Sequence, residues 1–122
     1  LDGLLKNVRF LGRKSGPELA NWVASSSALI YVSYFEGFGL PVLEGMLSGV
    51  PVVTSNLTSI PEVGGDSVIY VDPFNEDSIT TGMEKAMENN QELIKKALLQ
   101  AKKFSWDISA LKVKDLLLNA KN

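Results

Sequence analysis

Short apolar runs rich in β-branched residues alternate with longer segments of helical periodicity, and this alternation restricts the chain to few folds. The clearest run covers residues 28–33, and others cover residues 8–12, 51–55 and 68–71. Continuous apolar runs are typical of parallel strands that helices cover on both faces. The order of segments predicts β-α-β-α-β-α-β-α-α-α and therefore an α/β fold, a Rossmann-like parallel sheet with flanking helices.

The segments between these runs carry helix signals. Ser15, followed by Pro17 and Glu18, is typical of a capped helix start. A second helix is expected to begin near Leu40 and to end at Gly49, and residues 56–62 are expected to form a loop and a short helical turn. Three more helices are expected over residues 77–88, 91–103 and 108–120. Helical spacing places the following side chains inward: Leu19, Trp22 and Val23; Leu43, Met46 and Leu47; Ile79, Met83 and Met87; Leu93, Ile94, Ala97, Leu98 and Ala101.

Length and composition exclude several classes of protein. With 122 residues, 45% of them apolar, the chain suits one domain or part of one. It has no Cys and no His, which excludes disulfides, thiolate metal sites and Ser-His-Asp catalysis. A net charge of −2 argues against a nucleic-acid partner. No apolar run reaches the roughly 18 residues of a membrane span. Because Leu1 is neither Met nor part of a signal peptide, we expect a piece of a longer cytoplasmic protein.

The loop and helix that follow the run at residues 28–33 concentrate the chemistry. Glu36 comes just after that run, glycines flank Phe38, and Glu44 comes eight residues after Glu36. In open parallel sheets, ligands bind at the carboxyl ends of the strands, and the first turn of the next helix offers N–H groups to phosphate. Glycines let the backbone approach an anion, and carboxylates accept hydrogen bonds from paired sugar hydroxyls. The pattern therefore suits a nucleotide-diphosphate sugar.

The same residues also have a purely structural interpretation. Gly39 and Gly49 suit a loop and a helix end, Glu36 suits a solvated loop, and Glu44 suits the start of a helix. Thr58 and Ser59 suit helix caps and are weak candidates for lining a nucleotide pocket. A non-catalytic interaction module that acts through its surface helices therefore stays open as the alternative function.

Residues 34–46 (Tyr-Phe-Glu-Gly-Phe-Gly-Leu-Pro-Val-Leu-Glu-Gly-Met) resemble the E-x7-E segment of retaining glycosyltransferases with the GT-B fold, family 4 (group 1). Other stretches resemble the same family in order and spacing. They are residues 8–12 (third strand of the C-terminal domain), 49–56 (strand after the motif helix), 59–66 (Pro-Glu turn) and 104–106 (start of the last helix).

The resemblance implies a function. Residues that match Glu36 lie by the transferred sugar in that family, and residues that match Glu44 bind the ribose. The implied catalytic residue is Glu36, and the implied donor-binding residues are Glu44, Gly37, Phe38, Gly39 and Leu40. The implied donor is a UDP- or GDP-sugar, and no metal or other cofactor is implied. In the implied reaction a hexose passes from this donor to an acceptor hydroxyl, with retention of configuration at the anomeric carbon. The pattern at residues 59–66 is similar to members that use mannosyl donors.

The chain departs from the family pattern in two ways. Residues 1–122 match a partial GT-B C-terminal nucleotide-sugar-binding domain that lacks its first two strands, and the N-terminal acceptor domain is absent too. The family supplies an Arg and a Lys for the diphosphate from that absent part. From Ser15 to Glu84 this chain has no Lys or Arg that would replace them. We therefore expect the isolated chain to be incompetent as an enzyme.

The absent strands also have structural consequences. They would lie beside the run at residues 28–33, so without them the strand formed by this run has an open edge. We expect this edge to be closed by residues 8–12 in a rearranged sheet, or by a second copy of the chain in a homodimer. Many such transferases use lipid acceptors, so association of the parent protein with the inner face of the membrane is a further expectation. A nucleotide-sugar epimerase of GT-B architecture is a third alternative, which the lack of His disfavours.

Overall fold

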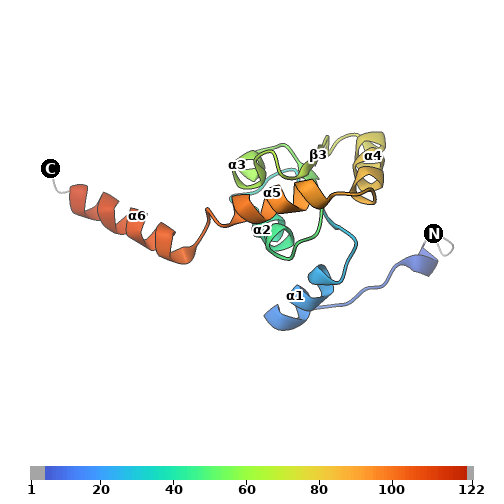
Figure 1. Cartoon of the computed structure of the whole chain (residues 1–122), viewed down its shortest axis with the longest axis horizontal. Helices are drawn as coiled ribbons and strands as arrows, with labels where there is room; N and C mark the ends of the chain where they lie inside the picture. Colours follow the sequence, from blue (N-terminus) through green and yellow to red (C-terminus); the bar gives the residue numbers. More distant parts are fainter. Residues whose placement is uncertain (1–4, 121–122) are drawn as a thin grey trace.

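Three short parallel strands form the centre of the fold in the computed structural model, which describes residues 5–120 (Figure 1). The elements are η1 (Leu5–Asn7), α1 (Gly16–Ala24), β1 (Leu29–Tyr31), α2 (Leu40–Leu47), β2 (Val52–Ser55), α3 (Ile60–Gly64), β3 (Ile69–Val71), α4 (Glu76–Ala86), α5 (Gln91–Ala101) and α6 (Trp106–Asn119). The strand order is β1-β2-β3, and Leu29 pairs with Val52 while Val53 pairs with Ile69. The predicted parallel α/β fold with flanking helices is confirmed.

Helices cover both faces of this sheet. On one face α2, α3 and α5 pack together and enclose the larger core. On the other face α4 packs against β2 and β3 around Val53, Val71 and Ala86. Side chains buried on both faces explain why the strands read as continuous apolar runs. The larger core contains Val42, Met46, Val52, Ile60, Val63, Val68, Ala97 and Ala101.

The inner face of α4 differs from the predicted one. Gly82 and Ala86 are buried, and Ile79 packs against the smaller core, whereas Met83 is half-exposed and Met87 is 67% exposed. A Cβ atom on Gly82 would lie 2.3 Å from Cγ1 of Val71. The small residues therefore let α4 approach the β-branched side chains of the sheet closely. Placing the two methionines inward was wrong, because hydrophobicity alone does not indicate how near the helix lies.

Two other predicted inner faces are partly wrong. In α2 the buried residues are Val42, Gly45 and Met46, while Leu47 is exposed. No residue of α1 is buried, and Trp22 lies under the guanidinium of Arg9, 5.6 Å from the ring centroid. In α5, Ala97 and Ala101 are buried as predicted, whereas Leu98, also placed inward, is exposed.

Residues 8–12 do not form the predicted first strand. Within the described residues this segment has no strand partner, and Phe10 is 83% exposed. A β-strand depends on hydrogen bonds from a neighbour, and these residues pair with neither edge of the sheet. The expectation that they close the β1 edge in a rearranged sheet is therefore wrong, and β1 forms one edge of the described sheet.

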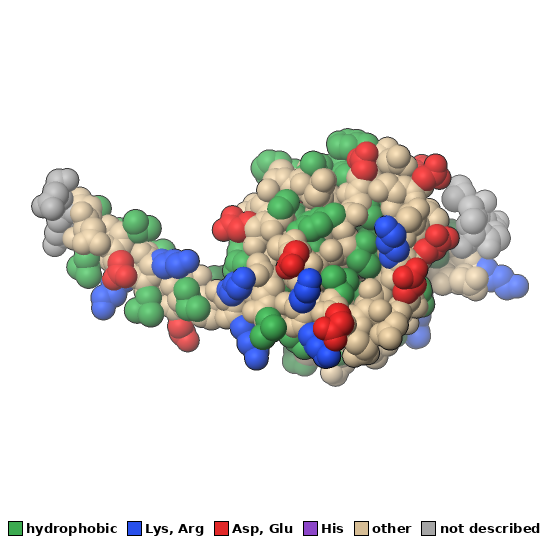
Figure 2. Space-filling view, turned by 45° about the horizontal axis from the view of Figure 1, so that its top comes forward, with side chains coloured by type: hydrophobic (Ala, Val, Ile, Leu, Met, Phe, Trp, Pro, Cys, Tyr) green, Lys and Arg blue, Asp and Glu red, His purple; other side chains and the backbone are tan. Residues whose placement is uncertain are grey.

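The last helix, α6, extends away from the body of the molecule (Figure 1). No residue of α6 is buried, and Figure 2 shows hydrophobic side chains along this arm. Trp106, at the base of the arm, is 84% exposed. Among the described residues, no helix is long and apolar enough to cross a membrane.

Candidate functional site

The loop from β1 to α2 carries Glu36 at the carboxyl edge of the sheet. The side chain of Glu36 is partly exposed, and its Oε1 accepts a hydrogen bond from the hydroxyl of Tyr31, the last residue of β1. Ionisation of the phenol would break this bond, so the bond raises the pKa of Tyr31 above its ordinary value of 10.0; burial and the nearby charge act in the same direction. Tyr31 therefore remains a donor at neutral pH.

The backbone of Glu36 is held by the loop between β2 and α3. The Glu36 N–H donates to Oγ1 of Thr58 over 3.1 Å, and Oγ of Ser59 donates to the Glu36 carbonyl over 2.9 Å. Thr58 adopts φ +54°, a left-handed conformation that costs on the order of 1–3 kcal/mol in a non-glycine residue. Ser59 occupies the N-cap position of α3 as expected, but its side chain makes no cap bond to the helix. Both side chains instead hold the Glu36 backbone.

Gly39 ends the loop and precedes α2. Its φ is +101°, it is buried, and a Cβ atom there would lie 2.6 Å from Cδ1 of Ile60. Only glycine fits both the backbone conformation and the space. No side chain caps α2, and Pro41 occupies its first turn, so the Leu40 N–H lies at an uncapped helix start.

The predicted site residues other than Glu44 form a short strip, residues 36–40, in which Gly39 is buried and the others are at least partly exposed. Gly37, Phe38 and Leu40 are exposed beside Glu36. Glu44 lies within α2, four residues or about 6 Å beyond Leu40 along the helix axis, and its side chain is exposed. The structure thus brings the five loop residues together and places Glu44 one turn further along. Their roles in binding stay predictions.

Carboxylates dominate the charge of this strip. The ion pairs formed by the described residues, Lys95–Glu92 and Lys96–Asp66, involve neither Glu36 nor Glu44. No Lys or Arg occurs between Ser15 and Glu84, so no basic side chain comes from α2, α3 or the strands. Within residues 5–120, no three metal-ligating side chains gather into a group.

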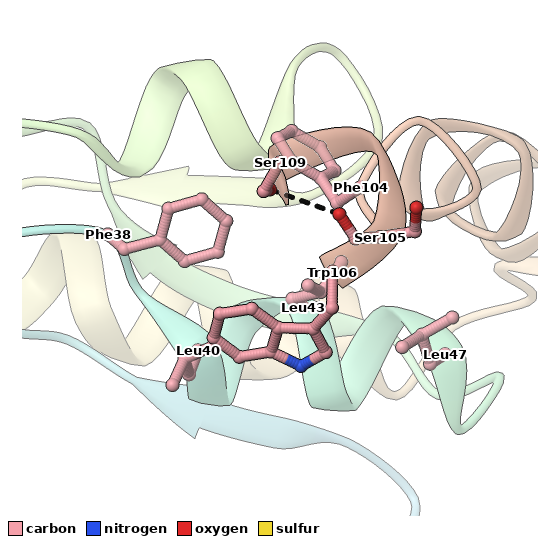
Figure 3. Close-up of a pocket in the computed structure, with 8 residues that line it drawn as sticks. All are labelled: Phe38, Leu40, Leu43, Leu47, Phe104, Ser105, Trp106 and Ser109. Atoms are coloured by element: carbon pink, nitrogen blue, oxygen red, sulfur yellow. Dashed lines mark hydrogen bonds between the residues drawn. The ribbon is translucent and has the colours of Figure 1, made fainter. Parts of the chain in front are cut away.

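A separate apolar cavity of about 380 Å³ lies beside this loop (Figure 3). The ring of Phe38 lies 5.6 Å from that of Phe104 in an edge-to-face arrangement, and Trp106 also lines the cavity. Neither glutamate lines the cavity. The remaining lining residues are Leu40, Leu43, Leu47, Ser105 and Ser109.

Tyr31, Thr58 and Ser59 are the contacts of Glu36 that sequence reasoning did not recognise. Thr58 and Ser59 lie 22 and 23 residues from Glu36 in the chain. No local pattern links such distant positions. Tyr31 occupies an apolar strand position, where an aromatic residue is normally interpreted as core.

The layered fold matches a solved protein. Sucrose-phosphate synthase from Thermosynechococcus elongatus superposes with a TM-score of 0.84 at 21% sequence identity, covering 98% of this chain and 33% of that one. The parallel sheet and its helices thus define an α/β domain of the GT-B class.

Sequence comparison then identifies the family. The model of the family described as "Glycosyl transferases group 1" matches residues 2–104, and the chain belongs to this family. O-antigen chain mannosyltransferase B of Escherichia coli is 40% identical over 103 residues, which are 82% of this chain and 27% of that protein. O-antigen chain mannosyltransferase RfbU of Salmonella typhimurium is 36% identical over 90 residues, 74% of this chain and 24% of that protein. The chain therefore spans about a quarter of the length of these relatives.

Proposed function

We propose that this chain is the donor-binding part of a retaining glycosyltransferase. It binds a nucleotide-diphosphate sugar, from which the parent enzyme transfers a hexose to an acceptor hydroxyl. Glu36 orients the donor sugar and stabilises the charge that develops on it, while Glu44 holds the ribose. The backbone amides of the loop approach the diphosphate, whose departure begins the reaction.

One observation carries the proposal. The Glu36 carboxylate is held at the carboxyl end of β1, directly before the uncapped start of α2, with Glu44 one turn along that helix. A sugar hydroxyl needs an acceptor, and a phosphate needs N–H donors. Both groups occur within this short stretch, at the edge of the sheet where open α/β folds bind ligands.

Mannose is the proposed sugar. Two of the relatives are named mannosyltransferases, and the pattern at residues 59–66 agrees with that class. The donor left open by the sequence is a UDP- or GDP-sugar, so GDP-mannose is tested first, with UDP-glucose as the comparison.

We expect replacement of Glu44 by alanine to weaken nucleotide binding by about tenfold or more, because hydrogen bonds to a charged acceptor contribute about 1.5–3 kcal/mol. NMR titrations of the chain with GDP, UDP, GDP-mannose and UDP-glucose measure this through the amides of Gly37, Gly39 and Leu40. Glu84→Ala is the matched control, because Glu84 is an exposed glutamate on α4, which packs on the opposite face of the sheet. A well-folded sample whose loop amides respond to no nucleotide would contradict the proposal and favour an interaction module.

The isolated chain is expected to bind its donor weakly. With no Lys or Arg from Ser15 to Glu84, the diphosphate lacks the charge-assisted contacts that are the strongest available to it. Affinities on the order of millimolar and no transferase activity follow from this proposal. The acceptor domain is the proposed further partner, and the proposed location of the parent protein is the cytoplasm, at the inner face of the membrane.

The open edge of β1 is proposed to pair with a second copy of the chain. Ile30, in the middle of β1, is exposed, and an unpaired edge strand offers N–H and C=O groups to another strand. We expect sedimentation equilibrium to show a concentration-dependent dimer, and Ile30→Lys to remain monomeric. A monomeric wild-type chain whose β1 amides exchange freely would exclude this pairing.

A further inference from the structure

We propose that Tyr31 is a positioning residue for Glu36, which holds one oxygen of the carboxylate so that the other faces a hydroxyl of the donor sugar. This inference rests on the proposed function, since it assigns Tyr31 a part in the same site. Neither the apolar run at residues 28–33 nor the loop motif itself points to such a role.

Glu36 is held by three hydrogen bonds from two separate segments. Thr58 and Ser59 hold its N–H and its carbonyl, so they determine where the backbone lies. Among the described residues, the carboxylate of Glu36 has one hydrogen-bond partner, the hydroxyl of Tyr31, which donates to Oε1. Removing the Tyr31 hydroxyl therefore leaves the backbone of Glu36 in place and releases only the carboxylate.

Tyr31 is well suited to hold another side chain still. It ends β1 in register with the fully buried Thr54 of β2, and its ring packs against the larger core. A tyrosine ring anchored in this way has little freedom of its own. Its hydroxyl is thus a fixed donor on the rigid part of the scaffold, whereas Glu36 lies in the loop.

Fixing the carboxylate matters because glutamate is flexible. Ordering a glutamate side chain costs rotamer entropy. When the protein bears that cost before the ligand arrives, the ligand binds more tightly. The Tyr31 bond occupies Oε1, and within the described residues Oε2 has no hydrogen-bond partner. Oε2 is therefore the acceptor that remains for the sugar, and the Tyr31 phenol, protonated at neutral pH, remains the donor to Oε1.

The test compares GDP-mannose with GDP on the same chain. GDP lacks the sugar that Glu36 contacts, so the ratio of the two affinities isolates the sugar contact. In Tyr31→Phe we expect GDP-mannose binding to weaken by about threefold to tenfold, the equivalent of about one net hydrogen bond, while GDP binding stays unchanged. A purely structural role of Tyr31 would weaken both ligands equally, because it would alter the whole loop.

Two variants sharpen this test. Tyr70→Phe is the matched control: Tyr70 also packs against the larger core, but its hydroxyl donates to the carbonyl of Gly65. In Glu36→Ala, we expect the added Tyr31→Phe change to leave the affinity ratio unaltered, because the side chain that Tyr31 positions is already gone.

The outcomes separate the inference from the proposed function. If the wild-type chain binds both ligands and Tyr31→Phe leaves their ratio unchanged, the role of Tyr31 is wrong and the donor site stands. If the folded wild-type chain binds neither GDP-mannose nor GDP, nor UDP-glucose or UDP run in parallel, both the donor site and the role of Tyr31 are wrong.

Discussion

Replacing Gly39 with alanine is expected to lower the free energy of unfolding by about 3 kcal/mol, the sum of backbone strain and overpacking. An alanine at φ +101° is strained, and its Cβ would lie 2.6 Å from Cδ1 of Ile60. Because Ile60 is fully buried, its side chain has little room to move away. The loop would have to shift, so donor binding at Phe38 and Leu40 is expected to weaken by at least about tenfold as well.

Two other glycines separate the causes of this loss. Gly49 has φ +72° with open space around it, so Gly49→Ala tests strain alone, with an expected loss of about 1–2 kcal/mol. Gly37 has neither a positive φ nor a close neighbour, and Gly37→Ala is expected to change stability by no more than about 0.5 kcal/mol. Urea unfolding followed by circular dichroism measures all three. Equal losses in the Gly39 and Gly49 variants would show that the Ile60 contact contributes nothing.

Replacing Gly82 with alanine is expected to destabilise the chain by about 2 kcal/mol, although alanine is the better helix former by about 1 kcal/mol. The added Cβ would lie 2.3 Å from Cγ1 of Val71 and 3.1 Å from Cγ1 of Val53. These side chains belong to the buried sheet, so α4 itself must move outward. Urea unfolding again gives the change in stability.

The control variants for α4 test its orientation. Met83→Ala changes the next residue, which is half-exposed, and is expected to alter stability by no more than about 0.5 kcal/mol. Val71→Ala removes the methyl group that a Cβ on residue 82 would meet. We therefore expect Gly82→Ala to cost less stability in the Val71→Ala variant than in the wild-type chain. If Met83→Ala were the costly substitution and Gly82→Ala the harmless one, α4 would face the sheet as its hydrophobic pattern alone predicts.

The fold class was predictable because a buried strand consists of consecutive apolar residues, which the sequence shows directly. The runs around β1, β2 and β3 are predominantly apolar, since helices pack on both faces of the sheet and β2 at its centre is buried along its whole length. Helix starts are also marked by nearby residues, and Glu18 accepts a hydrogen bond from the N–H of Ser15 as the capping pattern predicts. The segment at residues 8–12 also reads as an apolar run, but it has no strand partner within the described residues, and composition does not provide one.

Which residues of a helix face the core was less predictable. Hydrophobic periodicity favoured Met83 and Met87 in α4, but Gly82 and Ala86 are the buried residues. A glycine becomes an inner residue only when another surface approaches it closely, and that distance is a property of the packed molecule.

The sequence by itself determined the helices, the three strands β1, β2 and β3, and the position of the loop from Glu36 to Leu40, because each depends on residues close together in the chain. Tertiary structure alone decided what holds Glu36 in place. Tyr31 reaches it from the end of β1, and Thr58 and Ser59 reach it from the next loop, across 22 and 23 residues. Hydrogen bonds of this kind depend on where the sheet places its loops in space, and only the folded chain brings those groups within bonding distance.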